Sequence, residues 1–198
     1  MTASAKNSTA KDTRLTIVDA ARSHIYQHGY ATTSYANVAQ ETDLAKGNIQ
    51  HYFKSKSQLL EAVIEQYLQG VKDQLANWSL DCGTAYDCIE RFVSMVEDNA
   101  ENLSLYGCPV GTLNSELGKD NRQEQALAKQ VFDLYLRWLE ARFRSFLSRE
   151  EAELNAEHLM IMAQGASVIA HTYENPEVVH RQTKLMRQWL LEVCGGRA

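Results

Sequence analysis

Residues 38–64 read VAQETDLAKGNIQHYFKSKSQLLEAVI, and this stretch decides how the first third of the chain folds. Upstream of it, Thr33 offers an N-cap oxygen for a short helix that carries Tyr35 and ends near residues 42–43. Residues 45–53 form a second short helix after a turn of about three residues. Two short helices joined by such a tight turn predict a helix-turn-helix.

The second short helix has the composition of a DNA-reading surface. Basic, amide and aromatic side chains crowd together here with no carboxylate among them: Lys46, Asn48, Gln50, His51, Tyr52, Lys54 and Lys56. Amide side chains pair with an adenine edge in the major groove, whereas Lys, Tyr and backbone N–H groups bind phosphates. Gly47 removes a side chain at a place where the backbone and DNA can come close. Composition and spacing alone also fit a polar, solvated helical hairpin.

The same stretch resembles the DNA-binding signature of the TetR family of transcriptional regulators, from about residue 14 to residue 64. The matching positions are Val38-Ala39, Lys46-Gly47, Tyr52-Phe53, Lys56 and Leu59-Leu60. Three positions depart from the pattern. Asp43 stands where the family usually has the turn glycine, Ala45 replaces the usual capping serine, and Gln50 replaces a common tyrosine.

The resemblance assigns roles to individual residues of this segment. It implies that Thr33 contacts a phosphate, that Tyr52 and Lys56 hold the DNA backbone, and that the second helix faces the bases. The implied DNA-binding residues are Thr33, Lys46, Gly47, Asn48, Gln50, His51, Tyr52 and Lys56, with Lys46, Asn48 and Gln50 facing bases. Ile49 and Phe53 are expected in the core instead.

The remaining pattern predicts an all-α chain with a flexible arm at residues 1–11, a three-helix helix-turn-helix domain at 12–56 and a helical domain at 57–198. The resemblance implies that this last domain binds an effector and forms the dimer. The first helix starts at Asp12 and stops at Gly29. A long amphipathic helix starts at Ser55, with Gln58 as its capping-box partner. Further helices are expected around residues 85–96, 110–117, 121–147, 155–173 and 177–194, and residues 102–109 are expected to be irregular.

Charge and cysteine content narrow the possible classes of protein. Residues 1–60 carry a net charge of +3 and residues 61–198 carry −8, as in a chain whose basic end touches a polyanion. No segment is apolar enough for a signal peptide or a membrane span, which favours the cytoplasm. The four cysteines and the histidines lack metal-ligand spacing, so neither a metal nor a cofactor is expected. No catalytic motif is present, which argues against an enzyme.

The resemblance further implies a ligand pocket and a homodimer that pairs through the last two helices in a four-helix interface. Small residues at 163–170, AQGASVIA, allow a partner helix to approach closely. The final helix adds an apolar stripe formed by Leu185, Met186, Trp189, Leu190 and Val193. The same features are also consistent with packing inside one chain.

Six residues are candidates for sensing an effector: Tyr67, Tyr106, Cys108, Tyr135, Trp138 and His171. The five aromatic and imidazole side chains among them are candidates for lining the pocket. Residues 106–113, YGCPVGTL, resemble an element found in a subset of TetR-like regulators, some of which respond to electrophiles through its cysteine. Cys108 precedes Pro109 at an expected helix N-terminus, a setting that favours the thiolate. The alternative is a small buried residue between helices.

These observations predict a ligand-responsive repressor that binds a palindromic DNA operator as a dimer and is released by a small-molecule effector. Two alternatives remain open at this stage. One is a thiol-based sensor of electrophiles that uses Cys108. The other is an architectural DNA-binding protein without an effector.

Overall fold

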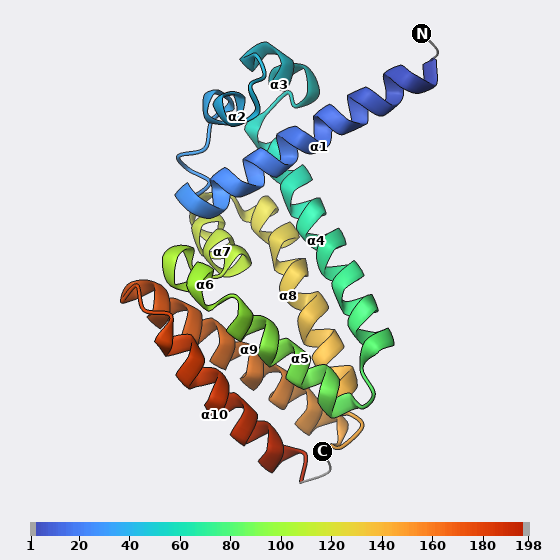
Figure 1. Ribbon diagram of the computed structural model, residues 1–198, viewed down its shortest axis with the longest axis vertical. Coiled ribbons are helices and arrows are strands. Elements are labelled where there is room, and N and C mark those ends of the chain that lie inside the picture. Colours follow the sequence, from blue (N-terminus) through green and yellow to red (C-terminus); the bar gives the residue numbers. More distant parts are fainter. Residues whose placement is uncertain (1–2, 196–198) are drawn as a thin grey trace. The chain divides into compact units, whose positions relative to one another are not determined.

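The computed structural model describes residues 3–195, and within that range the chain is helical with no strand, which confirms the predicted all-α fold. The helices are α1 (Ala3–His28), α2 (Tyr35–Thr42), α3 (Lys46–Tyr52), α4 (Lys56–Asp81), α5 (Ala85–Asp98), α6 (Ala100–Tyr106), α7 (Pro109–Asp120), α8 (Arg122–Phe143), α9 (Arg149–Thr172) and α10 (Glu177–Val193) (Figure 1). They form two compact units. Unit 1 holds the residues up to Gln69 together with Thr112–Lys129, and unit 2 holds Gly70–Gly111 and the residues from Gln130 onward.

Two expected irregular segments are helical instead. α1 begins at Ala3, before the expected start at Asp12, because a run of polar residues and alanine can continue a helix without presenting an apolar stripe. Residues 1–2 of the expected arm lie outside the described residues. The segment 102–109 was expected to be irregular, but most of it belongs to α6. This helix has seven residues, too few to show a helical repeat in the sequence, and it packs against α9.

Unit 1 is built around the helix-turn-helix. One apolar core joins the facing sides of α1, α2 and α3 to the first turns of α4 and to residues of α7 and α8. Ile17, Val38 and Ile49 are completely buried at its centre, one from each of the first three helices. Polar contacts fix the same arrangement: His24 Nδ1 on α1 lies 2.7 Å from Glu41 Oε1 on α2. The Tyr35 hydroxyl donates a hydrogen bond to the Phe53 carbonyl.

The turn between α1 and α2 is held by a carboxylate from a distant part of the sequence. Gly29 ends α1 with a φ of 86°, which leaves the following backbone N–H groups without helical partners. Glu116 of α7 accepts hydrogen bonds from two of them, Tyr30 N at 2.8 Å and Ala31 N at 2.5 Å. Lys56 completes the clamp, because its ammonium donates to the Ala31 carbonyl and lies 4.2 Å from the centre of the Tyr30 ring.

Unit 2 packs α9 and α10 side by side, with α5 against α10 and α6 against α9 (Figure 1). Aromatic pairs fill its core, including Trp78 with Trp138 and Phe92 with Tyr135. An ionic cluster joins α5 to α10: the Arg187 guanidinium lies 2.7 Å from Glu97 and 2.8 Å from Glu90. The hydrogen bond from Arg187 lowers the pKa of Glu97, so the carboxylate stays charged at neutral pH.

Glu116→Ala tests the clamp on the α1–α2 turn. We expect the free energy of unfolding to fall by about 1–2 kcal/mol, because two backbone donors lose their charged acceptor. Glu116→Gln keeps an acceptor oxygen and is expected to lose less. Urea denaturation of the full chain measures both effects. The control is Glu61→Ala on the exposed side of α4; an equal loss from Glu61→Ala and Glu116→Ala would contradict the clamp.

Candidate nucleic-acid interface

The helix α3 turns a polar face to solvent while two apolar residues anchor it. Ile49 is completely buried and Phe53 is 2% exposed, which confirms both as core residues. The exposed residues on the other side of α3 are Lys46, Gly47, Asn48, Gln50 and His51. Tyr52 is half-buried, and its ring packs edge-on against that of His51. The five exposed positions therefore form one continuous uncovered face without a carboxylate.

The turn before α3 explains two departures from the family signature. Asp43 adopts a left-handed conformation with a φ of 54°, the geometry for which a glycine is the usual solution. Aspartate is one of the few side chains that tolerate this region, so the turn forms at a small cost in strain. At the next helix start, Ala45 is the N-cap and provides no side-chain hydrogen bond. Both departures thus leave the backbone path of the motif intact.

Gly47 is not required by packing within the chain. A Cβ atom built at this residue meets no heavy atom within 4 Å. Gly47 also lies inside α3, where glycine is less favourable than alanine by about 1 kcal/mol. The absence of a side chain is therefore not explained by the fold of the described residues. Close approach of a binding partner to the α3 backbone would explain it.

The start of α2 differs from the sequence expectation. Ser34, not Thr33, is the N-cap: its hydroxyl accepts a hydrogen bond from Asn37 N, and the Asn37 side chain accepts from Ser34 N in return. Thr33 is only 3% exposed, and its hydroxyl donates to the Gly29 carbonyl. The sequence offers three consecutive hydroxyl residues at positions 32–34, and only the three-dimensional path of the turn decides among them. The exposed hydroxyl at this helix start belongs to Ser34.

Lys56 and Lys54 lie at the junction between α3 and α4. Lys56 is half-buried and already bound to the Ala31 carbonyl. Burial lowers its pKa, and the nearby Glu116 carboxylate opposes that effect. Lys54 is exposed and its ammonium donates to the Gln50 carbonyl. Ser55 caps α4 by accepting from Gln58 N, but the Gln58 side chain accepts from Lys54 N instead of closing the expected capping box.

The residues nominated for effector binding do not gather around one space. Tyr67 belongs to unit 1, where the Arg22 guanidinium lies 5.9 Å from its ring centre. The Tyr135 hydroxyl donates to Gln74, and burial raises the pKa of Tyr135. Trp138 donates to the Ser79 hydroxyl. The polar groups of Tyr135 and Trp138 are therefore already hydrogen-bonded within unit 2.

Tyr106, Cys108 and His171 lie near one another in unit 2, around the connection from α6 to α7. His171 is exposed, and its Nδ1 lies 3.2 Å from the Ser104 carbonyl of α6. Cys108 precedes α7, as expected from Pro109. Its sulfur accepts from Gly111 N at 3.4 Å and from the Gln164 amide of α9 at 3.5 Å. The half-buried Cys108 sulfur thus already has two N–H donors.

Among the described residues, no helix is long and apolar enough to cross a membrane, and no group of three or more His, Cys, Asp or Glu side chains is placed to hold a metal ion.

Comparison with known proteins bears on the first third of the chain and on the whole fold. Residues 17–63 match the family model described as bacterial regulatory proteins, tetR family. An uncharacterized HTH-type transcriptional regulator of Lactococcus lactis is 31% identical over 124 residues, covering 62% of this chain and 63% of that protein, so the chain spans less than two thirds of that relative. The HTH-type transcriptional regulator BetI of Cronobacter sakazakii is 25% identical over 93% of this chain and 92% of its own length.

Solved structures of TetR-family regulators have a similar fold. The crystal structure of regulatory protein TetR from Rhodobacter sphaeroides superposes with a TM-score of 0.76 at 25% identity, covering 88% of this chain and 96% of that one. Both of these relatives are named as regulatory proteins. The matched segment contains α2 and α3 with the exposed polar face described above. In its helix-turn-helix, its sequence matches and its fold, the chain is therefore similar to transcriptional regulators of the TetR family.

Proposed function

We propose that the chain is a repressor that binds a two-fold symmetric operator as a dimer, reads it with α3, and is released by a small-molecule effector. The observation that carries the proposal is the uncovered, carboxylate-free face of α3, which stands on buried Ile49 and Phe53. An α-helix with such a face fits the major groove. A dimer places two such helices on related half-sites.

Within this interface we assign base contacts to Lys46, Asn48 and Gln50 and backbone contacts to Gly47, His51 and Tyr52, all on α3. The phosphate contact at the start of α2 moves from Thr33 to Ser34, because only the serine is exposed. Lys56 supports the DNA backbone contact indirectly, through its hold on the Ala31 carbonyl. The DNA-binding domain in this proposal comprises residues 12–56, and residues 57–198 bind the effector and form the dimer.

Gly47→Ala separates a DNA contact from a folding requirement. We expect the free energy of unfolding to rise by about 0.5–1 kcal/mol, because alanine favours the helix and has open space around it. Operator affinity is expected to fall by about tenfold or more, equivalent to about 1.4 kcal/mol, because the added methyl group meets DNA. Urea denaturation and gel-shift titration on a duplex selected by the wild type measure the two quantities.

Gly70→Ala is the matched control, since Gly70 also lies in a helix with no atom near an added Cβ. It is expected to gain similar stability and to keep full operator affinity. Unchanged affinity in Gly47→Ala would show that the α3 backbone does not approach DNA.

The dimer interface is proposed on the outer faces of α9 and α10. Met186 and Leu190 of the expected apolar stripe are completely buried within unit 2, so they are core residues and are removed from the interface. The exposed apolar side chains instead follow a helical repeat on α9: Leu154, Ile161, Val168 and Ile169, with Leu185 on α10. Gly165 lies in the same stripe and is exposed. A stripe of this kind on two adjacent helices is consistent with a four-helix interface.

Ile161→Glu is expected to convert the dimer into a monomer, because the interface would bury an unpaired carboxylate. Ile161 is 66% exposed in the single chain, so the substitution leaves the core of unit 2 undisturbed. Leu80→Glu is the control, on a leucine of α4 that is 84% exposed and lies outside the stripe. Sedimentation velocity distinguishes the outcomes. A stable Ile161→Glu dimer would place the interface elsewhere.

A second candidate for the release signal is an electrophile that reacts with Cys108. Two N–H donors, from Gly111 and Gln164, lie within hydrogen-bonding distance of its half-buried sulfur. Burial raises the pKa of Cys194, and burial raises the pKa of Cys82 to about 12, so both of these thiols are poor nucleophiles near neutral pH.

The thiol-sensor alternative predicts that iodoacetamide labels Cys108 before Cys82 and Cys194, as mapped by mass spectrometry. It also predicts that a small electrophile lowers operator affinity of the wild type and leaves Cys108→Ser unaffected. Labelling of Cys108 after the other two, or an equal response of Cys108→Ser, would assign the thiol a packing role and leave an ordinary pocket ligand as effector.

A further inference from the structure

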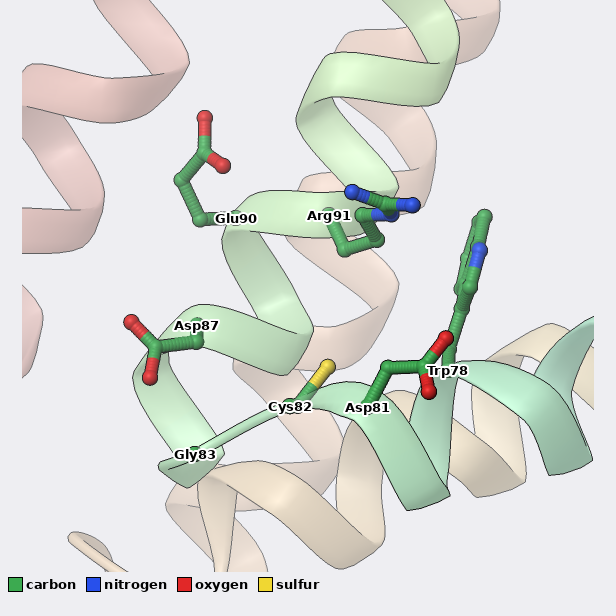
Figure 2. A pocket seen from close by; sticks show the side chains of 7 residues that line it. All are labelled: Trp78, Asp81, Cys82, Gly83, Asp87, Glu90 and Arg91. Carbon is green, nitrogen blue, oxygen red and sulfur yellow. The ribbon is translucent and has the colours of Figure 1, made fainter.

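A cavity of about 320 Å³ opens in unit 2 where α4 ends and α5 begins. It is lined by Trp78, Asp81, Cys82, Gly83, Asp87, Glu90 and Arg91 (Figure 2). None of the residues nominated above for effector sensing lines it. Cys82 directly follows the end of α4, and its sulfur points into this space (Figure 2). We refer to it as the Cys82 cavity.

The thiol of Cys88 lies close to that of Cys82. The Trp78 carbonyl accepts a hydrogen bond from Cys82 N at 2.9 Å, and the Cys88 sulfur lies 3.9 Å from the same oxygen atom. The Cys88 thiol of α5 is buried and lies within hydrogen-bonding reach of the Cys82 thiol. The short connection between α4 and α5 thus places one half-buried and one buried free thiol together at the end of a cavity.

The electrostatics of the cavity select among small reagents. Asp81, Asp87 and Glu90 contribute three carboxylates, of which Glu90 is paired with Arg187 and Asp87 caps α5 through Thr84. Arg91 is the one basic residue among the lining side chains. Burial, the hydrogen bond with Cys88 and the charge of Asp87 all raise the pKa of Cys82, and Arg91 opposes them. The cavity therefore disfavours anions and keeps Cys82 as a neutral thiol at rest.

We propose that Cys82 and Cys88 are a reversible dithiol site, closed to a disulfide by exchange with small cationic or uncharged disulfides that enter the Cys82 cavity. Because the pKa of Cys82 is raised, only a small fraction of it is thiolate near neutral pH, so the exchange is slow and speeds up as the pH rises. That thiolate attacks one sulfur of the small disulfide; a mixed disulfide forms and one small thiol leaves with a proton. Cys88 then attacks the Cys82 sulfur and expels the second small thiol. Two electrons pass to the small disulfide, and the two protein protons end on the two released thiols.

The sequence provides a direct readout for this site. Trypsin cleaves after Lys72 and Arg91 and nowhere between them, so one fragment carries both Cys82 and Cys88. The full-length chain is treated with cystamine, a dication, then alkylated and digested. We expect this fragment to lose two hydrogen atoms and to take no alkyl label, and to regain both thiols after reduction. A fragment that stays doubly alkylated, or that stops at a mixed disulfide, would overturn the proposal.

Two further comparisons sharpen the test. In Cys88→Ser the reaction is expected to stop with half of a cystamine molecule on Cys82, because the resolving thiol is missing; closure onto Cys108 or Cys194 instead would overturn the pairing.

Oxidised glutathione, which is anionic, is expected to react about tenfold more slowly than cystamine at low ionic strength, and added salt is expected to reduce this difference in rate. Equal or faster reaction with glutathione at low ionic strength would overturn the proposed charge selection.

Discussion

The helix-turn-helix depends on one carboxylate that holds the turn preceding it. Gly29 ends α1, and the two N–H groups that follow are satisfied by Glu116 rather than by a local cap. An unsatisfied backbone donor at a partly buried turn costs about 1–3 kcal/mol, which is a large share of the stability of a small domain. The Lys56 ammonium donates to the Ala31 carbonyl, so both the N–H and the C=O of Ala31 are hydrogen-bonded to side chains. These hydrogen bonds fix the turn and therefore the position at which α2 begins.

The polar face of α3 is available because apolar residues elsewhere position the helix. Ile49 and Phe53 anchor α3 in the core of unit 1, while Arg14 stacks on the Phe53 ring and Tyr35 donates to its carbonyl. The apolar contacts that anchor α3 thus lie on the side opposite its polar face. Packing within the chain does not explain why residue 47 is a glycine. A substitution at Gly47 can therefore change operator affinity without disturbing the core that holds α3.

Local spacing was enough to predict the helix-turn-helix, because both short helices and the three-residue turn lie within one continuous segment. Ile49 and Phe53 were predicted as core residues for the same reason. The role of Glu116 had no sequence signal, since its hydrogen-bond partners lie more than eighty residues away. Ser34 and Thr33 are adjacent hydroxyl residues, and the backbone path alone selects the cap.

Unit 2 was harder to predict, because every helix there is amphipathic and the pattern does not say which neighbour covers which residue. Met186 and Leu190 fit a dimer stripe in sequence but face the interior of their own unit, whereas Ile161 and Val168 are left uncovered. Two of the aromatic side chains proposed for a pocket pack on other rings, Trp138 on Trp78 and Tyr135 on Phe92. Both also donate hydrogen bonds, to Ser79 and Gln74 respectively. The helix α6 was missed because a helix of seven residues is too short to show a repeat.

The central claim is that two copies of α3 read a two-fold symmetric DNA site. Selection of duplexes from a fully random pool by the full-length chain, followed by sequencing, tests this claim most directly. The account predicts enrichment of one near-palindrome whose half-sites lie about one helical turn apart or a multiple of it. A pool that shows no enriched sequence, or one enriched for a single unpaired half-site, would contradict the account.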